Sequence, residues 1–159
     1  MLAPAEGPAT SDSQVELVWT AVTGTGLATG NSAILTYELL WDNGEPARTD
    51  FLLLADVDAA GATPTSFTLV GATEGATYRF KVRAVNIYGA GPASPEASIV
   101  ASDIPSRMEA VTTTRSGTDI ILTWVAPAAN GAALLAYEIK VRDQASGTYV
   151  KDTSKCDGS

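Results

Sequence analysis

The side chains that most often carry catalysis are scarce in this sequence. It contains no histidine, the usual acid–base group near neutral pH and the commonest metal ligand, and only one cysteine. A serine or cysteine nucleophile would therefore need another base, and the sequence has no Gly-x-Ser-x-Gly turn, phosphate-binding loop or paired set of metal ligands. A single cysteine cannot form a thiolate metal site or an internal disulfide. We therefore expect no enzyme activity and no cofactor.

A few carboxylates have the chemistry to bind calcium. Asp56 and Asp58 are separated by one residue, and Asp103 stands near the middle of the chain. Calcium prefers such oxygen ligands, but the dense aspartate spacing of a calcium loop is absent. We interpret Asp56 and Asp58 as solvated acids in a loop that runs from Asp56 to Pro64.

The basic side chains form one stripe, at Arg79, Lys81 and Arg83. Residues 1–103 contain twelve acids and four bases, whereas residues 104–159 contain six of each, so the net charge of −8 belongs to the first part. This excess of acid disfavours nucleic acid and anionic membranes as partners. We expect the stripe to pair with acids on neighbouring strands. No apolar run approaches the ~20 residues of a membrane span, and no leader precedes the first strand, so we expect a soluble segment without membrane insertion.

The basic stripe lies on a predicted β-strand. From Tyr78 to Ala84, apolar and basic residues alternate, which is typical of a strand with one buried and one solvated face. Asn86, Gly89 and Gly91 then predict a hairpin. Six further short strands, separated by Gly, Pro and Asp turns, indicate an all-β antiparallel β-sandwich. The predicted strands of this part are residues 2–8, 14–19, 34–41, 51–54, 66–69, 78–85 and 97–101.

The strand pattern then begins again. Asp119–Trp124 repeats the pattern of Gln14–Trp19 after 105 residues, with a tryptophan at the same position. A second Gly-containing loop and a strand from Tyr137 to Val141 follow it. We therefore divide the chain into a first unit, residues 1–103, and a second unit, residues 104–159. The junction, Ser102–Pro105, is too short for a free linker, so we expect the units to lie end to end with restricted bending.

These residues carry a resemblance to a known family. The first unit closely resembles the fibronectin type III domain, an immunoglobulin-like β-sandwich, whereas the second resembles only the front half of one. The resemblance implies that Trp19 lies between two sheets and that Tyr78 bonds the backbone of the Leu69–Gly75 crossover through its hydroxyl. The residues to which it assigns a structural core role are Trp19, Tyr37, Leu69, Tyr78, Trp124 and Tyr137.

The resemblance favours a non-enzymatic structural and interaction module. Such a unit would be part of a longer tandem-repeat surface, matrix or filament protein, with neighbouring repeats or copies of itself as partners. The alternative is an accessory β-sandwich domain of a larger secreted, carbohydrate-active enzyme. The corresponding locations are extracellular or cell-surface, with a cytoplasmic filament as the alternative.

Two segments have two interpretations each. Phe51, Leu52, Leu53 and Leu54 are apolar on both faces of a predicted edge strand, so they form an interface with another chain or are covered by the following loop. Cys156 either forms a disulfide with strands outside the present sequence, which would place the parent outside the cytosol, or stays reduced.

The second unit lacks the strands that would cover its apolar residues. We expect it to need completion, either by a missing stretch of the same parent chain or by strands from a neighbouring chain, because its own burial cannot offset the cost of ordering its backbone. The residues of this open apolar face are Ile120, Leu122, Trp124, Tyr137 and Ile139.

Overall fold

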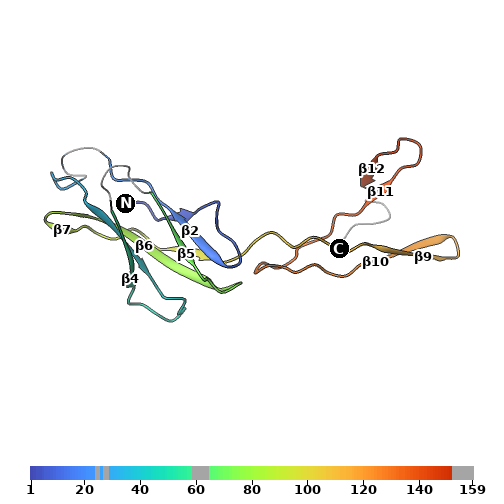
Figure 1. Ribbon diagram of the computed structural model, residues 1–159, viewed down its shortest axis with the longest axis horizontal. Coiled ribbons are helices and arrows are strands. Elements are labelled where there is room, and N and C mark those ends of the chain that lie inside the picture. The colour runs from blue at the N-terminus through green and yellow to red at the C-terminus, as the bar shows by residue number, and fades with distance from the viewer. Residues whose placement is uncertain (24–25, 27–28, 59–64, 152–159) are drawn as a thin grey trace.

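The computed structural model describes residues 1–23, 26, 29–58 and 65–151. The first unit consists of two antiparallel sheets that pack face to face, so the predicted all-β sandwich is confirmed (Figure 1). Among the described residues, no helix is long and apolar enough to cross a membrane. The smaller sheet has the order β1 (Ala5–Glu6), β2 (Gln14–Val18) and β5 (Ser66–Val70). The larger sheet has the order β4 (Leu52–Asp58), β3 (Thr36–Trp41), β6 (Thr77–Asn86) and β7 (Gly89–Ala90), and β8 (Ala97–Val100) also pairs with β6.

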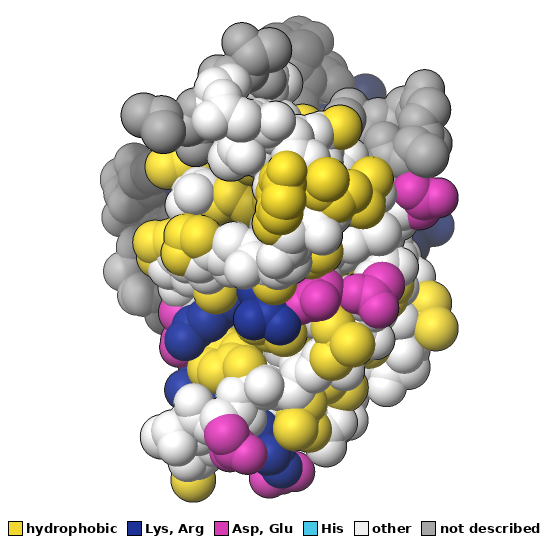
Figure 2. Space-filling view, turned by 90° about the vertical axis from the view of Figure 1, so that its left-hand side faces the viewer, with side chains coloured by type: hydrophobic (Ala, Val, Ile, Leu, Met, Phe, Trp, Pro, Cys, Tyr) yellow, Lys and Arg dark blue, Asp and Glu magenta, His cyan; other side chains and the backbone are white. Residues whose placement is uncertain are grey.

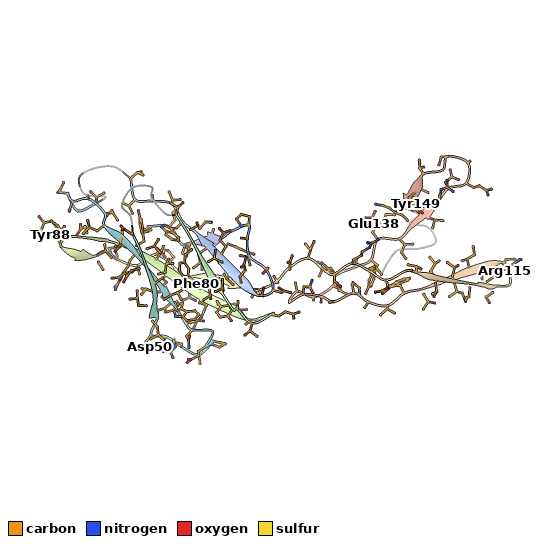
Figure 3. The ribbon with its side chains drawn as sticks, viewed as in Figure 1. Asp50, Phe80, Tyr88, Arg115, Glu138 and Tyr149 are labelled. Carbon is orange, nitrogen blue, oxygen red and sulfur yellow. The ribbon has the colours of Figure 1, made fainter. Side chains whose placement is uncertain are left out.

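Alternate residues of the strands form the core between the two sheets. On β6, Phe80 and Val82 are fully buried, while the basic residues Arg79, Lys81 and Arg83 that alternate with them are partly exposed. Phe80 lies in the interior of the sandwich in Figure 3. Each large side chain buried in this way contributes roughly 1.5 to 3 kcal/mol to folding. The buried apolar residues are Val15, Leu17, Trp19, Tyr37, Leu39, Tyr78, Phe80, Val82, Ile99 and Ala101.

Turns with positive φ connect the strands at the predicted positions. Asn43 and Gly44 follow β3 with φ values of 59° and 72°, a conformation that asparagine and glycine tolerate best. The hairpin predicted after the basic stripe is also present, because Asn86 of β6 pairs with Gly89 of β7. The chain therefore reverses direction at the end of the longest strand.

Strand β4 is longer than the sequence pattern indicated. The prediction of a loop beginning at Asp56 is wrong, because Asp56 pairs with Glu38 and the strand continues to Asp58. A β-bulge interrupts the pairing with β3: Leu39 lies opposite Ala55, but Leu40 lies opposite Leu53, so Leu54 is the additional residue. The bulge therefore places two consecutive residues, Leu54 and Ala55, against the core. Residues 59–64 of the predicted loop lie outside the described residues.

The described part of the second unit consists of two separate hairpins (Figure 1). None of the described residues from 102 to 151 is buried. The predicted strand from Tyr137 is wrong in its first part, because the strand begins only at Lys140. Residues 137–139 have no neighbouring strand to bond, and an isolated pair of strands is at best marginally stable in water. The hairpins are β9 (Thr112–Ser116) with β10 (Asp119–Thr123), and β11 (Lys140–Arg142) with β12 (Tyr149–Lys151).

Candidate functional site

The carboxylates that could suit a metal do not converge in the described structure. Asp56 and Asp58 are exposed on β4, and Asp103 accepts a hydrogen bond of 2.6 Å from the backbone of Ile104. Within residues 1–23, 26, 29–58 and 65–151, no three His, Cys, Asp or Glu side chains lie close enough together to hold a metal ion.

The basic stripe pairs with acids on neighbouring strands, as expected. Arg83 pairs with Glu38, the residue directly opposite on β3, and Lys81 and Arg79 approach Glu96 at 3.7 and 3.6 Å. In Figure 2, basic side chains lie beside acidic and apolar ones and form no large basic area on the face shown. The positive charges on this sheet are therefore paired with acidic side chains of the same domain.

A carboxylate that the sequence pattern did not identify organises one end of this sheet. Asp42 is buried, and its Oδ2 accepts a hydrogen bond of 2.9 Å from Arg79 Nε. The same guanidinium donates to the carbonyl oxygens of Arg48 and Glu45 at 2.5 and 3.4 Å. A hydrogen bond from the Arg48 side chain lowers the pKa of Glu45. These contacts hold the chain after β3 against β6, so the buried charge has a structural role.

Strand β4 is an edge strand of the larger sheet, as predicted. Leu52 and Leu53 are 41% and 54% exposed, whereas Leu54 packs against the core. The ring of Phe51 is covered by two basic side chains, with Lys81 Nζ 4.1 Å and the Arg79 guanidinium 5.5 Å from its centre. Of the four apolar residues proposed for an interface, only Leu52 and Leu53 are therefore available to another chain.

The predicted core residues of the first unit lie together. Trp19 and Tyr37 are buried with their ring centres 5.8 Å apart, and Leu69 packs against the same cluster in a partly buried position. Tyr78 is also buried, and its hydroxyl accepts a hydrogen bond of 3.0 Å from the backbone of Thr73. Trp19 Nε1 has no hydrogen-bond partner among the described residues.

The described structure contains a groove at the end of the first unit that faces away from the second. Its volume is about 650 Å³, and it lies between the N-terminal residues, the chain after β2 and the β6–β7 turn. Tyr88, 81% exposed, stands at this end of the molecule in Figure 3. The lining includes Leu2, Val22, Ile34, Ala84, Tyr88 and Pro92. The groove is mostly apolar.

The second unit repeats one aromatic pair of the first. Trp124 and Tyr137 have ring centres 5.4 Å apart at an interplanar angle of 60°, and the corresponding angle for Trp19 and Tyr37 is 59°. The second pair is only partly buried, because no further strand covers it in the described structure. Cys156 lies outside the described residues.

The turn that precedes each tyrosine is repeated as well. Ser32 donates a backbone hydrogen bond to Thr29, and Ala132 donates one to Ala129, at 3.4 and 3.3 Å. The two central residues of each turn have positive φ, and each turn lies at the same distance from its tyrosine. These residues are Gly30 and Asn31 at 64° and 58°, and Asn130 and Gly131 at 50° and 85°. The two units therefore share local geometry as well as sequence pattern.

The sheet order and the core define the first unit as an immunoglobulin-like β-sandwich module. The fibronectin type III domain family model matches residues 5–100, which is more than half of the chain. The chain therefore belongs to the fibronectin type III family.

Solved structures show similarity at the level of the fold. The fourth FNIII domain of a human protein has 15% identity and a TM-score of 0.50, and the match covers 63% of this chain and 75% of that one. The sixth such domain of human fibronectin type III domain containing protein 3 has 20% identity, coverage of 67% and 89%, and a TM-score of 0.49. Domains A168–A170 of titin have 20% identity and a TM-score of 0.47, with coverage of 63% of this chain and 32% of theirs. The present chain thus spans about a third of the titin structure.

Proposed function

We propose that this chain is a non-enzymatic structural and interaction module from a longer tandem-repeat protein, in which β-sandwich units space or join other parts. The observation that carries the proposal is the second aromatic pair, Trp124 with Tyr137, which has nearly the ring geometry of the first. A repeat of the same packing unit within one chain is the signature of an array.

The distribution of polar side chains supports the same function. The buried Asp42 and the basic side chains of β6 make ion pairs within the first unit. These charges therefore stabilise the domain and are not directed at a substrate. The first unit therefore offers surface for contact with other proteins, chiefly the edge of β4 and the groove near Tyr88.

The proposed partners are neighbouring units of the same protein or further copies of this chain. In the second unit, Ile120 is 71% exposed on the strand face that also carries Leu122, and an apolar face of this kind is stabilised when strands cover it. We propose that the following part of the parent chain supplies those strands. Exchange of strands with a neighbouring chain in a filament-like assembly is the alternative, and it predicts an oligomer.

The two proposed locations of the parent protein, outside the cell or in a cytoplasmic filament, predict different states of Cys156. A surface or matrix protein would carry Cys156 in a disulfide, whereas a cytoplasmic filament protein would keep it reduced. Mass measurement of the full-length protein with and without reductant distinguishes the two. A bridge to Cys156 supports an extracellular site, and its absence supports the filament.

The proposed array is tested by the parent gene and by the oligomeric state. The parent gene should encode, within about 200 residues on either side of this segment, further units that repeat the tryptophan and tyrosine spacing of this chain. An adjoining catalytic domain would instead identify the chain as an accessory domain and overturn the array. Sedimentation of the parent segment extended through the next 50 or so residues separates the two ways of covering the second unit. A monomer supports cover by the same chain, and a stable oligomer supports strand exchange.

A further inference from the structure

A backbone contact joins the two units. The Asn130–Gly131 turn of the second unit lies against the end of the first unit, where β8 leads into the junction. A Cβ atom added to Gly131 would lie 2.6 Å from the carbonyl oxygen of Ala101, 2.9 Å from the amide nitrogen of Gly75 and 3.2 Å from the Cα of Ser102. Real Cβ atoms do not approach other atoms so closely, so this position requires glycine.

The surface that receives the turn is held in place by the first unit itself. Gly75 donates a backbone hydrogen bond of 2.9 Å to Ala101, and Ala101 donates one of 3.0 Å to Ala76. Ala101 is fully buried, and Gly75 has a φ of 73°. The receiving surface is therefore hydrogen-bonded within the first unit.

Hydrogen bonds also connect the junction to the second unit. The amide of Asp103 donates to the carbonyl of Asn130 over 2.8 Å, and Asn130 Nδ2 donates to the carbonyl of Ile104 over 2.7 Å. Two residues further, Ser106 and Ala128 exchange hydrogen bonds of 3.0 and 2.9 Å. The junction is thus bonded along its length to the turn that contacts the first unit.

We propose that the end of the first unit is an interaction surface for a positive-φ turn with glycine at its second position, and that the contact between Gly75 and Gly131 sets the direction of the second unit. We call this contact, with Ala101, Ser102 and Asn130, the glycine joint. The inference goes beyond the proposed function, because it assigns a specific surface and the kind of turn that occupies it. The contact lies within the 159 residues of this chain, so the inference does not depend on the function of the parent protein.

The matched variants are Gly131→Ala and Gly117→Ala in the full 159-residue chain. Both residues have positive φ, 85° and 60°, so an alanine is strained at either position. Only at 131 does the new methyl group meet other atoms, since nothing lies within 4 Å of a Cβ at 117. A difference between the two variants therefore reports the close contact and not the backbone strain.

The measurement is the alignment of backbone amides by nuclear magnetic resonance. In the unmodified chain, residual dipolar couplings of residues 103–106 and 128–132 should fit the alignment tensor of the first unit. A nuclear Overhauser effect should also connect the Gly131 Hα protons with the Gly75 amide. Gly131→Ala should remove the common tensor and shift the Gly75 amide resonance, whereas Gly117→Ala should leave both unchanged.

Several results would overturn the glycine joint. One is the absence of the contact between Gly131 and Gly75 in the unmodified chain. This measurement needs no variant, so it does not depend on whether a variant folds. Another is a common tensor that survives Gly131→Ala. The variant Asn130→Gly removes the side-chain hydrogen bond to Ile104 and keeps a residue that adopts positive φ, so loss of the common tensor there would assign the direction to the Asn130 side chain instead. None of these results bears on whether the parent protein is a tandem array, which the gene sequence decides.

Discussion

The guanidinium of Arg79 donates a hydrogen bond from Nε to the buried Oδ2 of Asp42 over 2.9 Å. The other carboxylate oxygen of Asp42 accepts backbone hydrogen bonds from Gly44 and Arg79 at 3.0 and 3.2 Å. One carboxylate therefore fixes both the turn after β3 and its attachment to β6. Its side chain is 1% exposed and that of Arg79 is 22% exposed, so water screens this pair only in part.

The change Asp42→Asn tests this arrangement. An amide can still accept at one oxygen, but it loses the ion pair and places a donor against the guanidinium. We expect a loss of about 2 kcal/mol in the free energy of unfolding of the first unit. The control is Asp50→Asn, since Asp50 is 82% exposed in its side chain and lies 3.4 Å from Arg48. Chemical denaturation measures both, and equal midpoints for the two variants would contradict the role of Asp42.

The change Tyr78→Phe removes the hydroxyl that accepts the Thr73 amide and leaves the packing of the ring intact. We expect a loss of ~1 to 2 kcal/mol with no change of fold, because a partly buried backbone donor loses its partner. Tyr88→Phe is the matched control, since Tyr88 is 81% exposed. A denaturant midpoint for Tyr78→Phe equal to that of the unmodified chain would show that this bond does not support the crossover.

The sequence pattern predicted the part of the fold that depends on local periodicity. Tyr78, Phe80 and Val82 alternate with basic residues, and two-residue alternation is a direct consequence of strand geometry. The role of Asp42 could not be predicted, because its partner Arg79 is 37 positions away and no repeating pattern connects them. The place of Leu54 could not be predicted either, because the bulge exists only relative to the partner strand.

The edge of β4 is tested by adding charge where another chain would pack. Leu52→Lys together with Leu53→Lys should weaken any self-association, because both side chains are exposed on an edge strand. Val70→Lys with Val100→Lys adds the same charge at exposed positions away from β4 and the groove. Sedimentation velocity over a concentration series compares the two. An unmodified chain that is monomeric throughout, or an equal effect of both pairs, would remove the edge as an interface.

The two units should differ in amide hydrogen exchange. We expect slow exchange in β2, β3 and β6, which bond to strands and bury core residues, and fast exchange in the hairpins β9–β10 and β11–β12. The amides of Asp103 and Ser106 in the junction should be intermediate, because their bonds lie next to the first unit. Equal protection of both units in a monodisperse monomer would mean that the second unit is stable without further strands.

The turn between β11 and β12 should respond to acid. Hydrogen bonds from the Ser146 hydroxyl and from the backbone amides of Ser146 and Ala145 lower the pKa of Asp143 from its ordinary value of 3.8. A lowered folded-state pKa stabilises the turn above the unfolded-state pKa, and this contribution is lost as the pH falls through the lowered value. The Ser146 amide resonance should therefore move upfield on acidification. A titration midpoint for the Asp143 carboxyl at or above 3.8 would contradict the hydrogen bonds.

The order of the units along the chain is encoded in one position of a repeated turn. Gly131 occupies the place that Asn31 occupies in the first unit, and both residues have positive φ. Asn31 carries the Cβ atom that the contact with Ala101 and Gly75 excludes at 131. The first unit could therefore not stand in the second position behind an identical domain without moving away from it. The two units are thus not interchangeable at this contact, and exchanging their order would change the direction in which the second one leaves the first.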